Sequence, residues 1–376
     1  MRHLLFISTT LRPDSGYGSL TRNHCDAFYD KGVPFTLLLP HTAERAIVPY
    51  ATQVRYVLPN LPLNFGALPD LPKLRHFYAS VRWECAASTL MHSLLDFPYA
   101  ALGFRMARTR RIPFFFSALG TYSVAPFGRR IDRALFMPAY RGARRIFAIS
   151  DFTAEAMQAA AGEERHIDTV RLPAPPPTPS VSRSFSWLPS SARVILSVGP
   201  LKERKGMDVL VRAMPAIVRL LPDAHLVIAA AYGDERPYRA LAEEGGVAGN
   251  VHIVRNPSAD ELGALFARAD LFSMTPRSVD SEFEGYGLVY GEAGWYRLPV
   301  VASRSGGVPE AVLDGETGIL VPENDPCVTA QAIISVLRDE RLARRLGDAG
   351  YAHASRRTTA RYAEELLALY EAPYQP

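Results

Sequence analysis

Two glutamates, Glu284 and Glu292, stand eight residues apart and enclose a glycine-containing segment. The residues between them begin with Gly-Tyr-Gly-Leu at 285–288, which predicts a loop leading into a helix. Glycines let the backbone approach a ligand closely, and the free N–H groups at a helix start bind anions. The stretch therefore predicts an anion-binding helix start, with one acid before it and another about one turn inside the helix.

The rest of the chain predicts the elements that must hold this site. The apolar run at 299–302 follows the helix and is typical of a short buried strand. Short apolar strands alternate with helical stretches from the beginning, with a strand at 3–9, a helix at 19–31 and a further helix at 73–88. The alternation restarts at residue 193, so we expect a mostly parallel sheet in each half.

Residues 284–302 resemble the Glu-x7-Glu motif of the retaining GT-B glycosyltransferases, family 4-like, or glycosyl transferases group 1. Mannosyl- and glucosyltransferases of cell-surface polysaccharide synthesis typify this family. The following residues agree with the family pattern at 305–310 and at 314–322. So long a stretch in register is a specific signal, and the alternative is a helix that carries two surface acids.

A second loop, at 200–206, carries positive charge and resembles the family's Gly-Arg-Leu-x-x-x-Lys-Gly loop. The lysine of that loop binds the donor diphosphate and is matched here by Lys205. Pro200 replaces the family's arginine, and we expect Arg204 to supply the missing charge. Breaking the anomeric bond builds negative charge on the β-phosphate, which these cations would stabilise. The resemblance implies that Lys205, Arg204 and Glu284 are catalytic; otherwise Lys205 is an ordinary loop lysine.

The resemblance also implies a set of donor contacts. Glu292 would hold the ribose hydroxyls, because a carboxylate accepts two hydroxyl protons, and Glu284 would contact sugar hydroxyls. His92 stands in the place of a family histidine, although a lone histidine near a strand end is more often packed in the core. Leu119 replaces the family's sugar-binding histidine. The implied donor-binding residues are Gly16, His92, Gly120, Thr121, Gly285, Tyr286, Gly287, Leu288 and Glu292.

Length and composition set further bounds. A chain of 376 residues is too long for one ordinary core and predicts two domains. The three cysteines are scattered without metal-binding spacing, which favours a reducing compartment over a disulfide framework. The N-terminal apolar run is too short for a signal peptide, and none reaches the ~20 residues that span a bilayer. We therefore expect a cytoplasmic protein. No Asp-x-Asp motif or His/Asp cluster offers a metal site, so we expect no metal dependence and no cofactor.

The net charge is only +4, but the basic residues are unevenly distributed. Residues 101–148 contain ten arginines and a single acid, Asp132. This excess is either a solvated surface or a face that attracts anionic lipid or a phosphorylated substrate. No zinc, helix-turn-helix or RNA-binding motif is present, so nucleic acid is not a predicted partner. The arginines are at positions 105, 108, 110, 111, 129, 130, 133, 141, 144 and 145.

The implied fold class is α/β of the GT-B type, with two Rossmann-like domains whose parallel sheets face a central cleft. Residues 1–175 are expected to form the acceptor-binding domain and 191–355 the nucleotide-sugar-binding domain. Residues 176–190, rich in proline and serine, are the expected linker. Residues 356–376 are expected to form a helix that crosses back to the first domain.

The implied activity is metal-independent, retaining transfer of a hexose-type sugar from a UDP- or GDP-linked donor. The acceptor would be a glycan or a lipid-linked glycan precursor in polysaccharide or glycolipid synthesis, with peripheral contact at the inner membrane face. One alternative is a non-catalytic GT-B subunit that supports an active partner, because Leu119 and Pro200 depart from the family pattern. Another is a sugar-nucleotide epimerase. The sugar, the base and the acceptor are not determined by the sequence.

Overall fold

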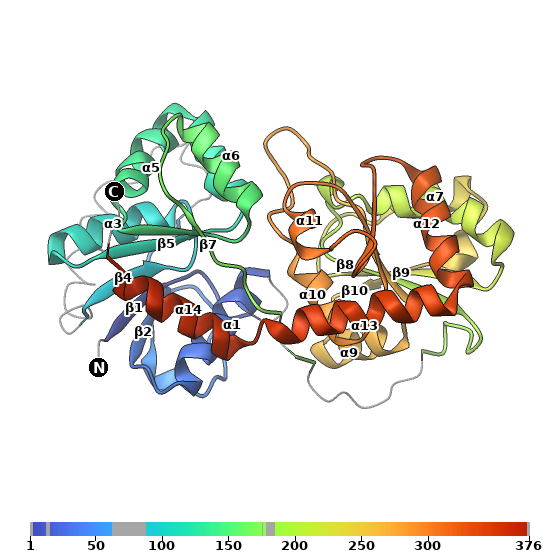
Figure 1. Cartoon of the computed structure of the whole chain (residues 1–376), viewed down its shortest axis with the longest axis horizontal. Coiled ribbons are helices and arrows are strands. Elements are labelled where there is room, and N and C mark those ends of the chain that lie inside the picture. Colours follow the sequence, from blue (N-terminus) through green and yellow to red (C-terminus); the bar gives the residue numbers. More distant parts are fainter. Residues whose placement is uncertain (1–2, 13–15, 62–87, 175, 178–184, 374–376) are drawn as a thin grey trace. The chain divides into compact units, whose positions relative to one another are not determined.

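The computed structural model describes residues 3–12, 16–61, 88–174, 176–177 and 185–373. The chain divides into two compact units: the N-terminal unit, Met1–Leu172 with Thr359–Pro376, and the C-terminal unit, Pro173–Thr358 (Figure 1). Most of the helix expected at 73–88 and most of the linker expected at 176–190 lie outside the described residues. None of the helices described is long and apolar enough to cross a lipid bilayer.

A seven-stranded parallel sheet forms the centre of the N-terminal unit, in the order β3-β2-β1-β4-β5-β6-β7. The chain builds the sheet outward from β1 in both directions, as in Rossmann-like folds. The strands are β1 Leu4–Ile7, β2 Phe35–Pro40, β3 Val54–Leu58, β4 Leu90–Ser93, β5 Phe114–Ala118, β6 Arg145–Ala148 and β7 Asp168–Thr169. The α-helices are α1 Gly16–Asp30, α3 Tyr99–Arg110, α4 Thr121–Val124, α5 Arg130–Gly142, α6 Asp151–Ala161 and α14 Thr359–Glu371, and the 3-10 helices are Ala51–Gln53 and Ala125–Gly128.

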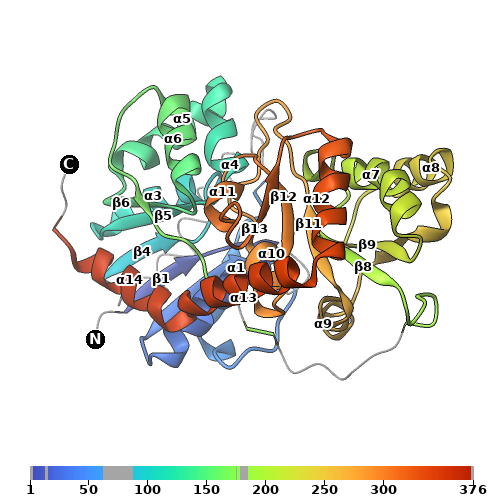
Figure 2. The ribbon, with the colours of Figure 1, turned by 45° about the vertical axis from the view of Figure 1, so that its right-hand side comes forward.

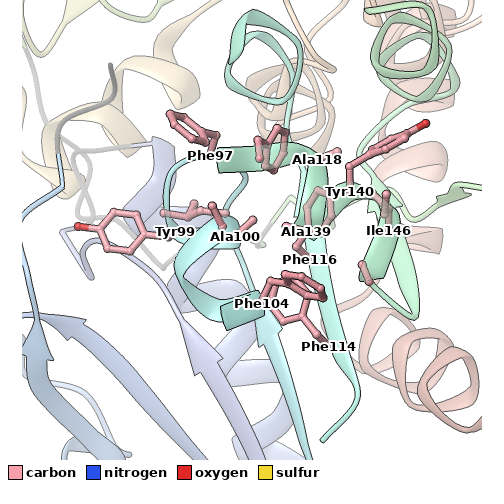
Figure 3. Packing of buried hydrophobic residues seen from close by; sticks show 14 of the residues in the cluster. Phe97, Tyr99, Ala100, Phe104, Phe114, Phe116, Ala118, Ala139, Tyr140 and Ile146 are labelled. Atoms are coloured by element: carbon pink, nitrogen blue, oxygen red, sulfur yellow. The ribbon is translucent and has the colours of Figure 1, made fainter. Parts of the chain in front are cut away.

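Strands β1, β2, β4 and β5 of this unit are buried on both faces, because helices cover each side of the sheet. Successive strand residues point to opposite faces. In β5, Phe114 and Phe116 join the apolar cluster that α3 and α5 cover. Figure 3 shows Phe104 of α3 beside Phe114, with ring centroids 5.8 Å apart. Phe115 points to the opposite face and packs edge-on against Tyr370 of α14. A hydrophobic run without alternation, as in β5, is what two-sided burial requires.

The last helix, α14, packs beside α1 on one face of this sheet (Figure 2). Two tyrosines attach it to buried histidines. The hydroxyl of Tyr362 is hydrogen-bonded to Nδ1 of His24 at 2.9 Å, and the hydroxyl of Tyr370 to Nδ1 of His92 at 2.6 Å. The C-terminal residues therefore complete the core that begins with β1.

The C-terminal unit contains a six-stranded parallel sheet, in the order β10-β9-β8-β11-β12-β13. Its strands are β8 Arg193–Val198, β9 Ala224–Ala230, β10 Val251–Arg255, β11 Leu271–Met274, β12 Val300–Ser303 and β13 Gly318–Val321. Its α-helices are α7 Met207–Leu220, α8 Arg236–Glu244, α9 Ala259–Arg268, α10 Leu288–Trp295, α11 Val308–Ala311, α12 Pro326–Arg338 and α13 Glu340–Arg356, and its 3-10 helices are Glu203–Lys205 and Ala248–Asn250.

Two helix pairs pack on this second sheet. Helices α7 and α12 pack against each other, and both contact β11. The apolar stripe of α7 follows helical spacing and is fully buried, at Met207, Leu210, Met214 and Ile217. Helices α10 and α13 form the other pair, and glycines bring them close together. A Cβ on Gly347 of α13 would stand 2.0 Å from the carbonyl oxygen of Arg297, which follows α10.

The predicted fold class, with a parallel Rossmann-like sheet in each half, is confirmed. The differences are local. Helix α1 begins at Gly16, three residues earlier than expected, and β13, α4 and α11 were not predicted. The last three have four residues each, so they contain too few residues for a periodic pattern.

Gly347→Ala should lower the stability of the C-terminal unit by about 1–3 kcal/mol, because the added methyl group overlaps the Arg297 carbonyl. Helix propensity alone predicts the opposite, a gain of about 1 kcal/mol. Gly350→Ala in the same helix is the matched control, since its Cβ would meet its nearest neighbour at 3.7 Å. Urea unfolding of the two variants should give a lower midpoint for Gly347→Ala alone, and equal midpoints would contradict this packing.

Candidate functional site

The loop between β8 and α7, residues 199–206, is held against the residues that follow β11. Gly206 has a φ of +65°, and a Cβ on it would stand 1.7 Å from the carbonyl oxygen of Thr275. The hydroxyl of Thr275 donates a hydrogen bond to the Gly206 carbonyl at 2.8 Å. Strands β8 and β11 are neighbours, so the loops at their carboxyl ends meet. A glycine at 206 is what permits this close approach.

The predicted catalytic residues are brought together on these loops. Nζ of Lys205 donates to Oε2 of Glu284 at 2.5 Å, and Nη1 of Arg204 donates to the same oxygen at 3.0 Å. Lys205 and Glu284 are only 9% and 8% exposed. Two cations from one loop therefore share one carboxylate from the other.

The pKa shifts of this cluster follow from its burial and charges. Burial lowers the pKa of Lys205, and the Glu284 carboxylate opposes that shift without cancelling it. Burial would raise the pKa of Glu284, but the charges of Lys205 and Arg204 outweigh it and hold the pKa below its ordinary value. Glu284 is thus a carboxylate at neutral pH, and the cluster carries a net positive charge.

The start of α10 lies four residues after Glu284, as the sequence predicted. Gly287 precedes the helix with a φ of +86°, and a Cβ there would stand 2.5 Å from the ring of Tyr290. Tyr290 is in turn fixed by donating its hydroxyl proton to the Met274 carbonyl at 3.0 Å. The first N–H groups of the helix, beginning with Leu288, have no carbonyl partner within it. These are the N–H groups that the sequence predicts to bind an anion, and that role stays a prediction.

The main chain of Glu284 is fixed by the glycines after β12. The amide of Gly307 donates to the Glu284 carbonyl at 2.9 Å. A Cβ on Gly306 would stand 2.4 Å from that carbonyl oxygen. The residues at 305–310 that agree with the family pattern therefore hold the loop carrying Glu284.

Glu292, the second predicted acid, lies in the second turn of α10. In the part of the chain that the structure describes, no hydrogen bond or ion pair joins its carboxylate to another residue. Burial raises the pKa of Glu292 to about 7. A carboxylate in such surroundings has unused acceptor capacity for hydroxyl groups.

Arg277 is a site residue that sequence reasoning missed. Its Nη1 atom donates to both oxygens of Asp208, each at 3.0 Å, and to Oδ1 of Asn324 at 3.0 Å. Its backbone N–H donates to the Arg204 carbonyl at 2.9 Å. Arg277 therefore ties the lysine loop to α7 and to the residues after β13. No local signal identifies it, because its partners lie 47 and 69 residues away in the chain.

Four predicted contacts, Gly16, His92, Gly120 and Thr121, belong to the N-terminal unit, whereas Gly285 and Tyr286 lie between Glu284 and α10. Gly120 and Thr121 stand at the start of α4, where Gly120 has a φ of +129°. The backbone N–H of Leu119 donates to Oγ of Ser123 at 2.8 Å, which fixes the loop where the family carries a histidine. Gly16 is the first residue of α1, and a Cβ on it would meet nothing within 4 Å. Their donor contacts stay predictions.

The same loop is anchored by Asp96, which sequence reasoning also missed. Asp96 is 2% exposed and accepts a hydrogen bond from the Ser123 hydroxyl at 2.7 Å. Burial raises the pKa of Asp96 to about 7, although its hydrogen bonds oppose the shift. An aspartate two residues before a proline has no distinctive sequence signal, so only the packing identifies it.

The expectation that His92 contacts the donor is corrected by the structure. His92 has no exposed surface, and its two ring nitrogens are hydrogen-bonded to Tyr370 at 2.6 Å and to Ser117 at 3.0 Å. Burial lowers its pKa to about 3, so the ring is neutral. Because both nitrogens are occupied within the core, His92 has a packing role, the alternative stated from the sequence.

No group of three or more His, Cys, Asp or Glu side chains is placed to hold a metal ion among the residues that the structure describes. Metal independence therefore stays a prediction.

Residues 182–353 match the protein family described as Glycosyl transferases group 1. A GDP-mannose-dependent alpha-(1-6)-phosphatidylinositol monomannoside mannosyltransferase of Mycolicibacterium smegmatis is 40% identical over 159 residues, 42% of this chain and 42% of that protein. A D-inositol 3-phosphate glycosyltransferase of Corynebacterium glutamicum is 34% identical over 195 residues, 50% of this chain and 46% of that protein. The chain thus matches less than half of the length of these relatives.

Solved structures share the fold over nearly the whole chain. Sucrose-phosphate synthase from Thermosynechococcus elongatus superposes with a TM-score of 0.78 and 20% identity. The superposition covers 98% of this chain and 98% of that chain. Alr3699/HepE of Anabaena, in complex with UDP and glucose, has a TM-score of 0.76 and 17% identity, with 98% of this chain and 99% of that chain covered. The predicted GT-B fold is therefore confirmed, and the resemblance to the group 1 glycosyl transferases is confirmed for residues 182–353.

Glu292→Gln should change how stability depends on pH. The folded-state pKa of Glu292, about 7, exceeds its ordinary value of 4.5, so the folded chain binds the proton more tightly. The parent should therefore lose stability at this residue as pH rises from about 4.5 to 7, and the neutral variant should not. The stability of the variant relative to the parent should rise by about 1–3 kcal/mol from pH 5 to pH 8.

Urea unfolding at several pH values measures this difference. Glu243→Gln, on the exposed side of α8, removes the same charge from the same unit and should give no such slope. A flat profile for Glu292→Gln would show that its carboxylate is well solvated in the folded protein.

Proposed function

We propose that this chain, whose residues 182–353 match the group 1 glycosyl transferases, moves a sugar from a nucleoside-diphosphate donor to an acceptor. The observation that carries the proposal is the cluster of Lys205, Arg204 and Glu284, with the start of α10 four residues after Glu284. One buried and one partly buried cation, together with free helix N–H groups, suit a diphosphate.

The proposed chemistry follows from where charge develops. When the anomeric bond breaks, the β-phosphate oxygen gains negative charge, and Lys205 and Arg204 would neutralise it. The N–H groups of Gly287 and Leu288 would add hydrogen bonds that are already oriented. Transfer would proceed with retention, the acceptor attacking from the face that the diphosphate leaves, with a phosphate oxygen taking the acceptor proton. The chain then needs no separate carboxylate base.

Glu292 is proposed to hold the two ribose hydroxyls. Its carboxylate has unused acceptors, and hydroxyl donors would relieve the cost of its burial. Glu284 and residues 285–287 would contact the sugar. The donor remains UDP- or GDP-linked in this proposal. One relative is named for GDP-mannose and a phosphatidylinositol mannoside, so GDP-mannose with a lipid-linked inositol acceptor is the first pair to test.

A membrane-facing surface is proposed on α3 and at the start of α5. The ten arginines predicted as one basic region do not all face solvent. Four of them bind carbonyl or carboxylate groups of the unit itself, at positions 133, 141, 144 and 145, and Arg110 is half-buried. The other five are exposed, at positions 105, 108, 111, 129 and 130, although Arg129 also lies 3.6 Å from the carboxylate of Asp132. Exposed Ile131 adjoins them, and basic residues beside an apolar side chain suit an anionic leaflet. This would place the protein at the inner membrane face.

A non-catalytic subunit remains the second candidate, because Leu119 and Pro200 replace the family's histidine and arginine. The position of Arg204 argues for the enzyme, since its guanidinium contacts Glu284 and restores a second cation. An epimerase would release free sugar or an isomerised nucleotide sugar in the absence of an acceptor.

Lys205→Ala should reduce sugar transfer by at least about 100-fold and weaken GDP or UDP binding by about 10-fold or more, because a buried charge-assisted contact is lost. Transfer is measured with GDP-mannose and a panel of UDP-sugars against a lipid-linked inositol acceptor, and binding by calorimetry. Arg212→Ala is the control, because it removes an exposed positive charge on α7 of the same unit and should leave transfer and binding unchanged. A folded parent that binds nucleotide but transfers nothing would favour the non-catalytic subunit.

Arg105→Glu/Arg108→Glu should reduce binding to vesicles that contain anionic lipid by about 10-fold or more, at roughly 1 kcal/mol for each basic residue near the surface. Arg212→Glu/Arg219→Glu on α7 makes the same charge change on exposed residues of the other unit and should have little effect. Cosedimentation with phosphatidylglycerol and with phosphatidylcholine vesicles measures this. Equal losses for both double variants would mean that net charge alone, and no defined face, drives binding.

A further inference from the structure

Two cations share a single carboxylate oxygen in the C-terminal unit. Lys205 and Arg204 both donate to Oε2 of Glu284, at 2.5 and 3.0 Å. The side chains of Lys205 and Glu284 are each 11% exposed, and that of Arg204 is 20% exposed. The two cations that a diphosphate requires are therefore already neutralised, in part, by a carboxylate of the chain.

The rest of the cluster leaves Glu284 as the principal anion. Glu282 lies 3.6 Å from Nε of Arg204, but its side chain is 46% exposed and water screens its charge. Lys202 adds a third positive charge that acts on Lys205. Without Glu284, two poorly solvated cations would stand side by side, and burying unpaired charges is costly. Glu284 thus stabilises the pair in the unliganded chain.

The main chain of Glu284 is fixed by the glycines after β12, so only its side chain can change partner. The Gly307 amide holds its carbonyl, and Gly306 packs against it. A bound diphosphate would offer the two cations several oxygens and at least two negative charges. Because it carries more oxygens and more charge, the diphosphate would displace the Glu284 carboxylate from the two cations. The released carboxylate would then need new hydrogen-bond donors.

We propose that Glu284 is an internal counter-ion that occupies Lys205 and Arg204 until a nucleotide binds, and that its displacement favours a sugar-loaded donor over the free nucleoside diphosphate. The inference rests on the proposed function. A nucleotide sugar supplies hydroxyl groups to the released carboxylate, whereas a nucleoside diphosphate leaves it buried and unpaired. After transfer, Glu284 would return to its cations and promote release of the nucleoside diphosphate.

The decisive probe is inorganic pyrophosphate, which contains neither ribose nor sugar. Glu284→Gln should bind pyrophosphate, GDP and UDP about 10- to 100-fold more tightly than the parent, because a competing charge is removed. The same variant should transfer sugar more slowly and be inhibited more strongly by the nucleoside diphosphate. Glu282→Gln is the matched control, since it removes an exposed carboxylate beside the same arginine. Its pyrophosphate affinity should change by less than about threefold.

Calorimetry measures the affinities, and the melting temperature with and without pyrophosphate shows whether Glu284→Gln is folded. If its cations have lost their partner, pyrophosphate should raise its melting temperature more than that of the parent. Suppose that the parent binds nucleotide through Lys205, but Glu284→Gln binds pyrophosphate no more tightly than the parent does. This result would overturn the counter-ion role of Glu284 and leave the proposed function intact. A parent that binds neither pyrophosphate nor any nucleoside diphosphate would overturn the proposed function itself.

Discussion

Two cations with little access to water need an anion beside them, and this requirement shapes the carboxyl end of the second sheet. Lys205 and Arg204 come from the loop after β8, and Glu284 comes from the loop after β11. Neither loop could bury its charged side chains alone, because the hydration energy that an unpaired ion loses on burial exceeds what contacts within one loop provide. The contact between the loops is therefore electrostatic as well as steric. It fixes two cations on the carboxylate of Glu284, four residues before the start of α10, and both the cations and the first N–H groups of that helix suit a diphosphate.

Close backbone packing makes that electrostatic contact possible. At Gly206 and at Gly306 a Cβ would overlap a carbonyl oxygen of the neighbouring loop, so the backbones of the loops touch where a larger residue would separate them. Arg277 extends the same network by joining the lysine loop to Asp208 and Asn324. These backbone contacts and hydrogen bonds hold the charged groups in position before a ligand arrives. Such preorganisation is what makes an electrostatic site effective.

The N-terminal unit shows how the same fold uses polar groups for packing. His92 and His24 lie in the core and bind the tyrosines of α14, so the end of the chain is needed to satisfy groups near its beginning. Asp96 and Ser123 fix the loop that carries Leu119 in place of the family's histidine. A histidine at a strand end and an aspartate after it carry the same sequence signal whether they bind a ligand or a neighbouring helix. Only their burial and partners distinguish the two roles.

The sequence by itself determined the parallel sheets and the start of α10, and its resemblance to the family singled out Lys205, Glu284 and Glu292. Those features depend on local patterns: alternating strands and helices, glycines at loop ends, and acids at fixed spacing. The tertiary structure decided what depends on distant partners. It showed that both cations share one oxygen of Glu284, that Arg277 and Asp96 support the loops, and that His92 belongs to the core. The physical reason is that burial and hydrogen bonding are set by residues tens or hundreds of positions away, whereas spacing along the chain reports only on neighbours.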